Sequence, residues 1–176
     1  MEKDFMIMCK ERGYEVIDLS YHHNYSDETA EALRRDYSPA SLSVRVSPDL
    51  LIQKESGGLY KSSFVELKTG NSSVMQMEAF QLLQNKVLEK NLKTPCLYIY
   101  RGKLSNGKMI ACNAEDIRVS QLVIPNASKN RFLRPILLRS FEVPLKEREY
   151  IDGYSNDPYV EVSDITNWFP ITEYLN

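Results

Sequence analysis

Residues 47–70 read SPDLLIQKESGGLYKSSFVELKTG, and this stretch decides the expected fold. Two strand-like runs flank the turn Ser56-Gly57-Gly58, so they are expected to pair as a hairpin. The hairpin would bring Asp49 of the first run beside Glu66 of the second, and Lys68 would project from the same strand face as Glu66. Two neighbouring carboxylates repel each other unless a cation neutralises them. The stretch therefore predicts a divalent-metal site next to a lysine.

The flanking sequence predicts an α/β fold in which a mixed central β-sheet is flanked by helices. The order of apolar patterns along the chain supports this fold, with a helix C-cap expected at Gly13 and a helix stop at Thr94-Pro95. The expected helices cover residues 2–12, 27–35 and 73–91, and the expected strands cover residues 14–19, 43–53, 59–69, 96–100 and 108–112.

This order of elements, with Pro48-Asp49 and Glu66-Leu67-Lys68 on neighbouring strands, resembles the αβββαβ core of the PD-(D/E)xK, or restriction-endonuclease-like, nucleases. The resemblance covers residues 1–101 and implies a metal-dependent phosphodiester hydrolase that uses Mg²⁺ or Mn²⁺. It implies that Asp49, Glu66 and the backbone carbonyl of Leu67 are metal ligands, and that Lys68 is catalytic. Alternatively, Pro48-Asp49 is an ordinary turn and Glu66 and Lys68 lie on a solvated edge strand.

Two further positions are candidates by the same resemblance. Gln76 precedes Phe80 by four residues, which is similar to the Gln-x-x-x-Tyr element of RecB-like members, so it is a candidate catalytic residue. A capping box with Ser73 explains Gln76 equally well. Glu11 is the candidate metal ligand on the first helix, with Glu2 and Asp4 as alternatives, and all three also suit a solvent-facing position.

Two histidines offer a different function. His22 and His23 precede the hairpin, and a histidine in such a position serves as an extra manganese ligand in viral cap-snatching endonucleases of the same fold. The resemblance therefore leaves a cap-snatching-type RNA endonuclease open as an alternative, beside packing of the pair in a surface loop.

Charge is distributed unevenly along the chain. Residues 54–139 carry fourteen basic and six acidic side chains, whereas the two ends together carry eight basic and eighteen acidic ones, for a formal net charge of -2. A basic block can bind a phosphate backbone even when the whole chain is slightly acidic. The candidate nucleic-acid contacts are Lys54, Lys61, Lys129, Arg131 and Arg134.

Length and composition predict one domain of 176 residues, with a core at 1–112 and a C-terminal extension at 113–176 packed on it. No export signal or membrane span is evident, so a cytoplasmic protein without a membrane partner is expected. The three widely spaced cysteines predict free buried thiols. The acidic, aromatic tail from Glu142 either closes over the core or forms a homodimer contact.

These observations favour a metal-dependent nuclease with nucleic acid as its partner, and DNA over RNA. Two other interpretations stay open, namely a relative of the same fold that binds nucleic acid or protein without cutting, and an unrelated α/β protein in which the motif is accidental.

Overall fold

The computed structural model describes residues 1–35, 41, 44–128, 130–152 and 155–176, without the side chains of Tyr21, His22 and Arg34. The helices are α1 (Glu2–Glu11), α2 (Tyr21–Asn24), α3 (Asp27–Arg35), α5 (Ala79–Leu92), α6 (Asn130–Ser140) and α7 (Ile171–Leu175). The strands are β1 (Glu15–Asp18), β2 (Leu50–Ser56), β3 (Leu59–Gly70), β4 (Met75–Glu78), β5 (Cys96–Gly102), β6 (Ile110–Asn113), β7 (Gln121–Pro125), β8 (Leu145–Arg148), β9 (Tyr159–Val162) and β10 (Phe169–Pro170).

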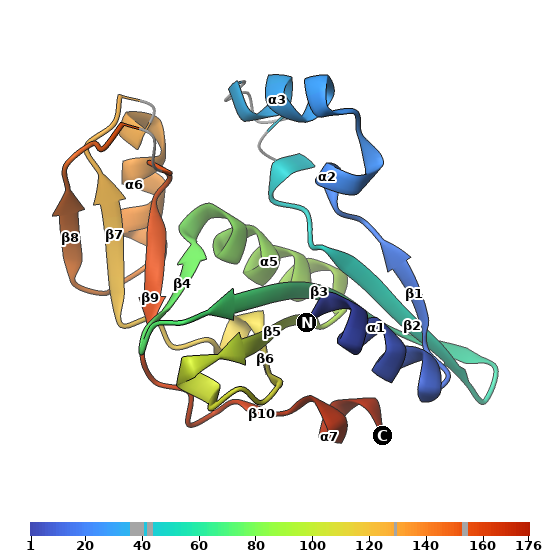
Figure 1. Ribbon diagram of the computed structural model, residues 1–176. Helices are drawn as coiled ribbons and strands as arrows, with labels where there is room; N and C mark the ends of the chain where they lie inside the picture. Colours follow the sequence, from blue (N-terminus) through green and yellow to red (C-terminus); the bar gives the residue numbers. More distant parts are fainter. Residues whose placement is uncertain (36–40, 42–43, 129, 153–154) are drawn as a thin grey trace.

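The larger sheet has six strands in the order β1-β2-β3-β5-β6-β10 (Figure 1). Its central pair, β3 and β5, is parallel, and the other pairs are antiparallel. The crossover between β3 and β5 contains α5, as expected for a parallel connection. The predicted fold class, a mixed sheet flanked by helices with an αβββαβ order of core elements, is confirmed.

The hairpin of β2 and β3 turns at two glycines with positive φ, Gly57 at 62° and Gly58 at 79°. Glycine adopts this backbone conformation without the penalty that a Cβ atom would bring. The register pairs Leu50 with Val65, and β3 continues past this pair to Gly70 along β5 alone. Val65 is therefore the last residue of β3 that pairs with β2, and Glu66 follows it without a β2 partner.

The two faces of β3 pack against different helices. Val65 and Leu67 contact the core that includes Phe5 and Cys9 of α1. Phe64 belongs to the other face, which packs on the core that contains Leu82 of α5. Because side chains alternate along a strand, Glu66 and Lys68 face α5.

A second sheet of four strands, β4-β9-β7-β8, forms beside α6 and was not expected from the sequence (Figure 1). Its strand β4 occupies residues that were predicted to be helical, so α5 begins at Ala79 and not at Ser73. The predicted capping box between Ser73 and Gln76 is therefore wrong. The strand predicted over residues 43–53 begins only at Leu50, so Asp49 lies just before β2.

The C-terminal third of the chain contributes to both sheets. Strands β7, β8 and β9 build the second sheet, whereas β10 pairs with β6 at the edge of the first. One hydrophobic core contains Tyr98 of the first sheet together with Val160 of the second and Leu137 of α6. The predicted free buried thiols are confirmed at all three cysteines. Among the described residues, no helix combines the length and apolar character that crossing a membrane requires.

Candidate functional site

Asp49 immediately precedes β2, and it lies beside the part of β3 that no longer pairs with β2. Its Oδ2 atom accepts a hydrogen bond of 2.8 Å from the backbone N–H of Leu67, and its carbonyl oxygen accepts one of 2.8 Å from Leu19. The carboxylate thus satisfies a backbone donor that a longer β2 would have paired. This bond fixes Asp49 beside β3 and engages only one of its two carboxylate oxygens.

Glu66 is a buried carboxyl group, with 2% of its surface exposed. Its Oε1 atom lies 2.6 Å from the Nζ atom of Lys68, whereas Oε2 is buried without a hydrogen-bond partner among the described residues. Burial raises the pKa of Glu66 to about 7, against the opposing effect of the Lys68 charge, and the nearby Asp49 raises this pKa further. A buried carboxylate oxygen without a donor is costly, so this atom is suited to an electropositive ligand.

Gln81 completes the group around Lys68. It lies in the first turn of α5, is 7% exposed, and its Oε1 atom accepts a hydrogen bond of 2.9 Å from Lys68 Nζ. The same amide favours the ionised form of Glu66 and lowers its pKa. Gln81 therefore holds the Glu66–Lys68 pair in place, a role that the sequence analysis did not assign.

A cavity of about 520 Å³ opens beside Asp49, and we call it the acidic cavity. It is lined by Met1, Glu2, Ser20, His23, Asp49, Leu67 and Thr69. Ligand atoms of Glu2, Asp18 and His23 all lie within 4.8 Å of one another, although the three residues come from α1, β1 and α2. Such a set of two carboxylates and an imidazole is a possible metal-binding group.

The Nδ1 atom of His23 lies 2.8 Å from Asp18 Oδ2. This hydrogen bond and the Asp18 charge raise the pKa of the exposed His23 imidazole, and Glu2 and Asp49 act in the same direction. Asp49 lines the same cavity as His23, and its charge contributes to the raised pKa of both Glu66 and His23. The side chain of His22, the other candidate histidine, is outside the described part of the chain.

On the first helix, the structure favours the alternative Glu2 over Glu11. Glu2 lines the acidic cavity, whereas Glu11 is exposed at the opposite end of α1. Nine residues of helix separate the two by about 13 Å. We therefore do not retain Glu11 as a ligand of this cavity.

The candidate basic residues lie away from the Glu66 group. Lys54 and Lys61 are cross-strand partners near the tip of the hairpin, four residue pairs from Leu50, which corresponds to about 13 Å. Their ammonium groups lie over the rings of Tyr14 and Tyr174, at 5.2 Å and 4.4 Å from the ring centroids. These contacts indicate a packing role on the α1 side of the sheet.

The remaining basic candidates belong to the region of α6. Arg131 is exposed on this helix, and Arg134 forms an ion pair with Glu147 of β8. Lys129 lies outside the described residues. No contact joins Arg131 or Arg134 to the Glu66 group in the part of the chain that the structure describes.

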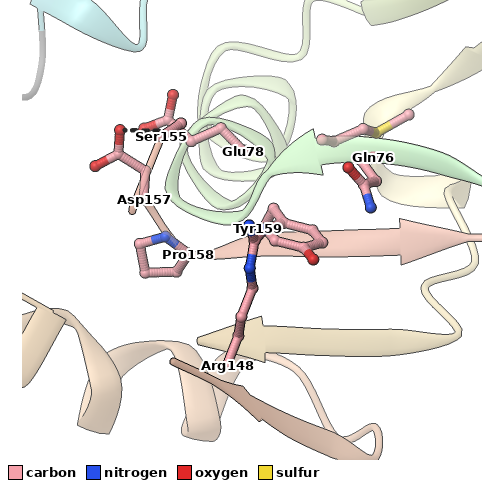
Figure 2. A pocket seen from close by; sticks show the side chains of 8 residues that line it. Gln76, Glu78, Arg148, Ser155, Asp157, Pro158 and Tyr159 are labelled. Carbon is pink, nitrogen blue, oxygen red and sulfur yellow. Dashed lines mark hydrogen bonds between the residues drawn. The ribbon is translucent and has the colours of Figure 1, made fainter. Parts of the chain in front are cut away.

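Gln76 lies in β4, where its amide donates a hydrogen bond of 3.4 Å to Glu161. It lines a separate cavity of about 280 Å³ together with Glu78, Arg148 and Tyr159 (Figure 2). The described contacts of Gln76 thus belong to the second sheet, while Gln81, five residues further along, contacts Lys68. Gln81 and Asn85 are two amides spaced i, i+4, but only the structure shows that they lie on the buried face of α5.

Replacing Gln81 by leucine should destabilise the protein by about 1–2 kcal/mol, because Lys68 loses an acceptor and the buried Glu66 loses a favourable amide. The free energy of unfolding in urea at pH 8, without divalent metal, measures this effect. Gln84→Leu on the same helix is the matched control and should change stability by about 0.5 kcal/mol or less. Equal effects of the two substitutions would contradict the assigned role of Gln81.

No protein-family model matches the chain, and no curated protein sequence matches it. Among solved structures, it is similar to Hjc, a Holliday junction resolvase from the archaeal hyperthermophile Archaeoglobus fulgidus, with 10% sequence identity and a TM-score of 0.49. The match covers 99% of this chain and 97% of the resolvase. The order and pairing of this chain's own core elements agree with the αβββαβ order expected from the sequence.

Proposed function

We propose that this protein is a metal-dependent nuclease that hydrolyses phosphodiester bonds in nucleic acid, with DNA as the favoured substrate. The observation that carries the proposal is the buried Glu66 carboxylate, which has Lys68 on one oxygen and, within the described part of the chain, no hydrogen-bond donor on the other. We further propose that residues 1–176 act as one domain, because one hydrophobic core contains residues of both sheets.

The donor set fits a hard divalent cation. Asp49 and Glu66 offer carboxylate oxygens, and the backbone carbonyl of Leu67 is a third oxygen donor of the kind that Mg²⁺ and Mn²⁺ accept. The Oε2 atom of Glu66 adds a reason to expect a cation, because a buried carboxylate oxygen that lacks a donor among the described residues is costly. A bound Mg²⁺ or Mn²⁺ would supply a water of lowered pKa and neutralise phosphate charge.

The chain's own residues prepare the site for this chemistry. The Leu67 N–H orients the Asp49 carboxylate, and Gln81 orients the ammonium group of Lys68. Lys68 remains 23% exposed, so its charge can reach a phosphate that enters beside Glu66. We assign Lys68 the stabilisation of the negative charge that develops on the phosphate oxygens during hydrolysis.

The direct test is cleavage of labelled substrates with Mg²⁺, Mn²⁺ or EDTA. The substrates are linear duplex DNA, single-stranded DNA, a four-way DNA junction and RNA. Cleavage should require the metal and should be lost in Asp49→Asn, a variant that keeps an oxygen for the Leu67 N–H. Equal cleavage by the wild type and Asp49→Asn, or full cleavage in EDTA, would overturn the proposal.

One observation favours a second candidate, an RNA endonuclease that uses His23 as a metal ligand. His23 lines the same cavity as Asp49 and lies beside Glu2 and Asp18. Imidazole nitrogen is a weaker partner than oxygen for Mg²⁺ and a better one for transition-metal ions. This candidate therefore predicts a metal preference as well as a substrate preference.

Under this second candidate, His23→Ala should lower Mn²⁺-supported RNA cleavage by about tenfold and leave Mg²⁺-supported DNA cleavage within about twofold of the wild type. Initial rates with each metal and each substrate provide the measurement. His23→Gln is the matched control, because it retains a polar side chain without the imidazole. Unchanged RNA cleavage in both variants would leave the DNA nuclease as the better proposal.

A further inference from the structure

A second cavity adjoins the acidic cavity and carries the opposite charge. It measures about 750 Å³, and we call it the basic cavity. Its lining includes Asn71, Arg101, Lys103 and Asn106, and it shares Met1 and Thr69 with the acidic cavity. Carboxylates line the acidic cavity, whereas the described lining of the basic cavity contains two cations and no carboxylate.

The two cavities adjoin along strand β3. Leu67 lines the acidic cavity, and Thr69 lines both and lies on the same strand face. Two residues of strand cover about 6.6 Å. Arg101 of β5 is the register partner of Thr69, so its side chain leaves the sheet at this same position.

The loop that carries Lys103 is held in a defined shape. Ser105 is buried, and its hydroxyl oxygen lies 2.7 Å from the carbonyl oxygen of Lys108 and 3.1 Å from that of Gly102, within hydrogen-bond reach of both. A Cβ atom at Gly102 would lie 2.0 Å from the carbonyl oxygen of Gly70, so only glycine allows β3 and β5 to end this close together. Lys103 therefore projects from a rigid turn at the end of the parallel strands.

The two cations of the basic cavity differ in their contacts. Arg101 donates to Asp4 at 2.8 Å and to the carbonyl of Gly107 at 2.9 Å, so it is held in place by the protein. Lys103 is exposed and makes no ion pair among the residues that the structure describes. Lys103 is consequently the cation that can bind an external anion without breaking an existing contact.

We propose that the basic cavity binds a phosphate of the nucleic-acid backbone that flanks the phosphate being cleaved, with Lys103 as its main contact. The assignment rests on the proposed nuclease function and adds the path of the bound strand. The scissile phosphate lies at Asp49, which lines the acidic cavity and also adjoins the Glu66 group, and the strand continues along β3 across Thr69 to Lys103. The contact is to the phosphate, so it acts on every base sequence alike.

The first test measures binding of a labelled duplex as a function of salt, in Glu66→Gln protein that cannot cleave it. Adding Lys103→Ala should remove one phosphate contact and flatten the slope of log affinity against log salt by about 0.9. The Glu66→Gln protein should bind the duplex more tightly than the protein that also carries Lys103→Ala, and this affinity ratio should fall about 3.5-fold between 50 and 200 mM salt. Lys10→Ala, at the far end of α1, is the matched control and should keep the slope.

The second test replaces single phosphates by neutral methylphosphonates along the cleaved strand. A methylphosphonate at one position near the scissile bond should weaken binding by the protein that retains Lys103 and have no effect on binding by Lys103→Ala. Equal slopes for Lys103→Ala and Lys10→Ala, or no methylphosphonate position that depends on Lys103, would overturn the inference. If the wild-type protein cleaves nucleic acid in that case, the proposed function stands. If the wild type neither binds nor cleaves nucleic acid, both fail.

Discussion

Replacing Glu66 by glutamine is expected to lower the rate of nucleic-acid cleavage by about three orders of magnitude, or about 4 kcal/mol of transition-state stabilisation. Glutamine has the shape of glutamate but no negative charge, so it removes the main electrostatic reason for a cation to bind beside Asp49. Lys68 would keep an oxygen acceptor at this position. The loss would therefore report on charge rather than on packing.

Single-turnover cleavage with saturating protein, together with calorimetric titration of Mn²⁺, separates catalysis from metal binding. Both signals should be lost in Glu66→Gln. Glu55→Gln, an exposed position near the hairpin turn, makes the same chemical change away from the site and should behave as the wild type. Full Mn²⁺ binding by Glu66→Gln would show that Glu66 is not a ligand.

The stability of the metal-free protein should fall as pH rises from about 4.5 to about 7, because of Glu66. In this window the folded protein holds a proton on Glu66 that the unfolded chain has released, so raising the pH favours unfolding. Each unit of pKa shift corresponds to about 1.4 kcal/mol, and the whole shift gives a contribution of at most about 3 kcal/mol. The contribution is present in full below pH 4.5 and lost above pH 7.

Urea unfolding at pH 4.5 and pH 8, in EDTA, measures this contribution as a difference between proteins. On going from pH 4.5 to pH 8, the free energy of unfolding of Glu66→Gln should rise by up to about 3 kcal/mol relative to that of the wild type, since all other titrating groups are shared. Glu55→Gln should run parallel to the wild type. Parallel pH profiles for the wild type and Glu66→Gln would show that the Glu66 pKa is not raised.

The sequence predicted those parts of the fold whose signals are local. Gly13, with φ of 77°, follows α1 as a helix C-cap glycine does, and Gly57-Gly58 set the hairpin. The sequence could place Asp49 near Glu66 and Lys68, because a single hairpin brings the start of β2 beside this part of β3. Local turn chemistry and strand alternation were sufficient for these assignments.

Assignments that depend on distant partners could not be made from local patterns. Met75–Glu78 pairs with β9, more than eighty residues away, and this pairing overrides the helical pattern that continues into α5. The capping-box pattern at Gln76 therefore misplaced the start of α5. The choice of Glu2 over Glu11 likewise depends on which end of α1 meets Asp49, and helical spacing alone cannot decide this.

The hydrogen bond between Asp49 and the Leu67 N–H makes folding and site assembly the same event. The donor belongs to the central strand of the sheet, so Asp49 is held in position as soon as β3 is formed, before any ligand arrives. A cation then encounters a preorganised carboxylate and need not order a loop, which removes an entropic penalty from binding. The affinity of the site for the cation then depends mainly on the charge of Glu66 and on the cost of desolvating it.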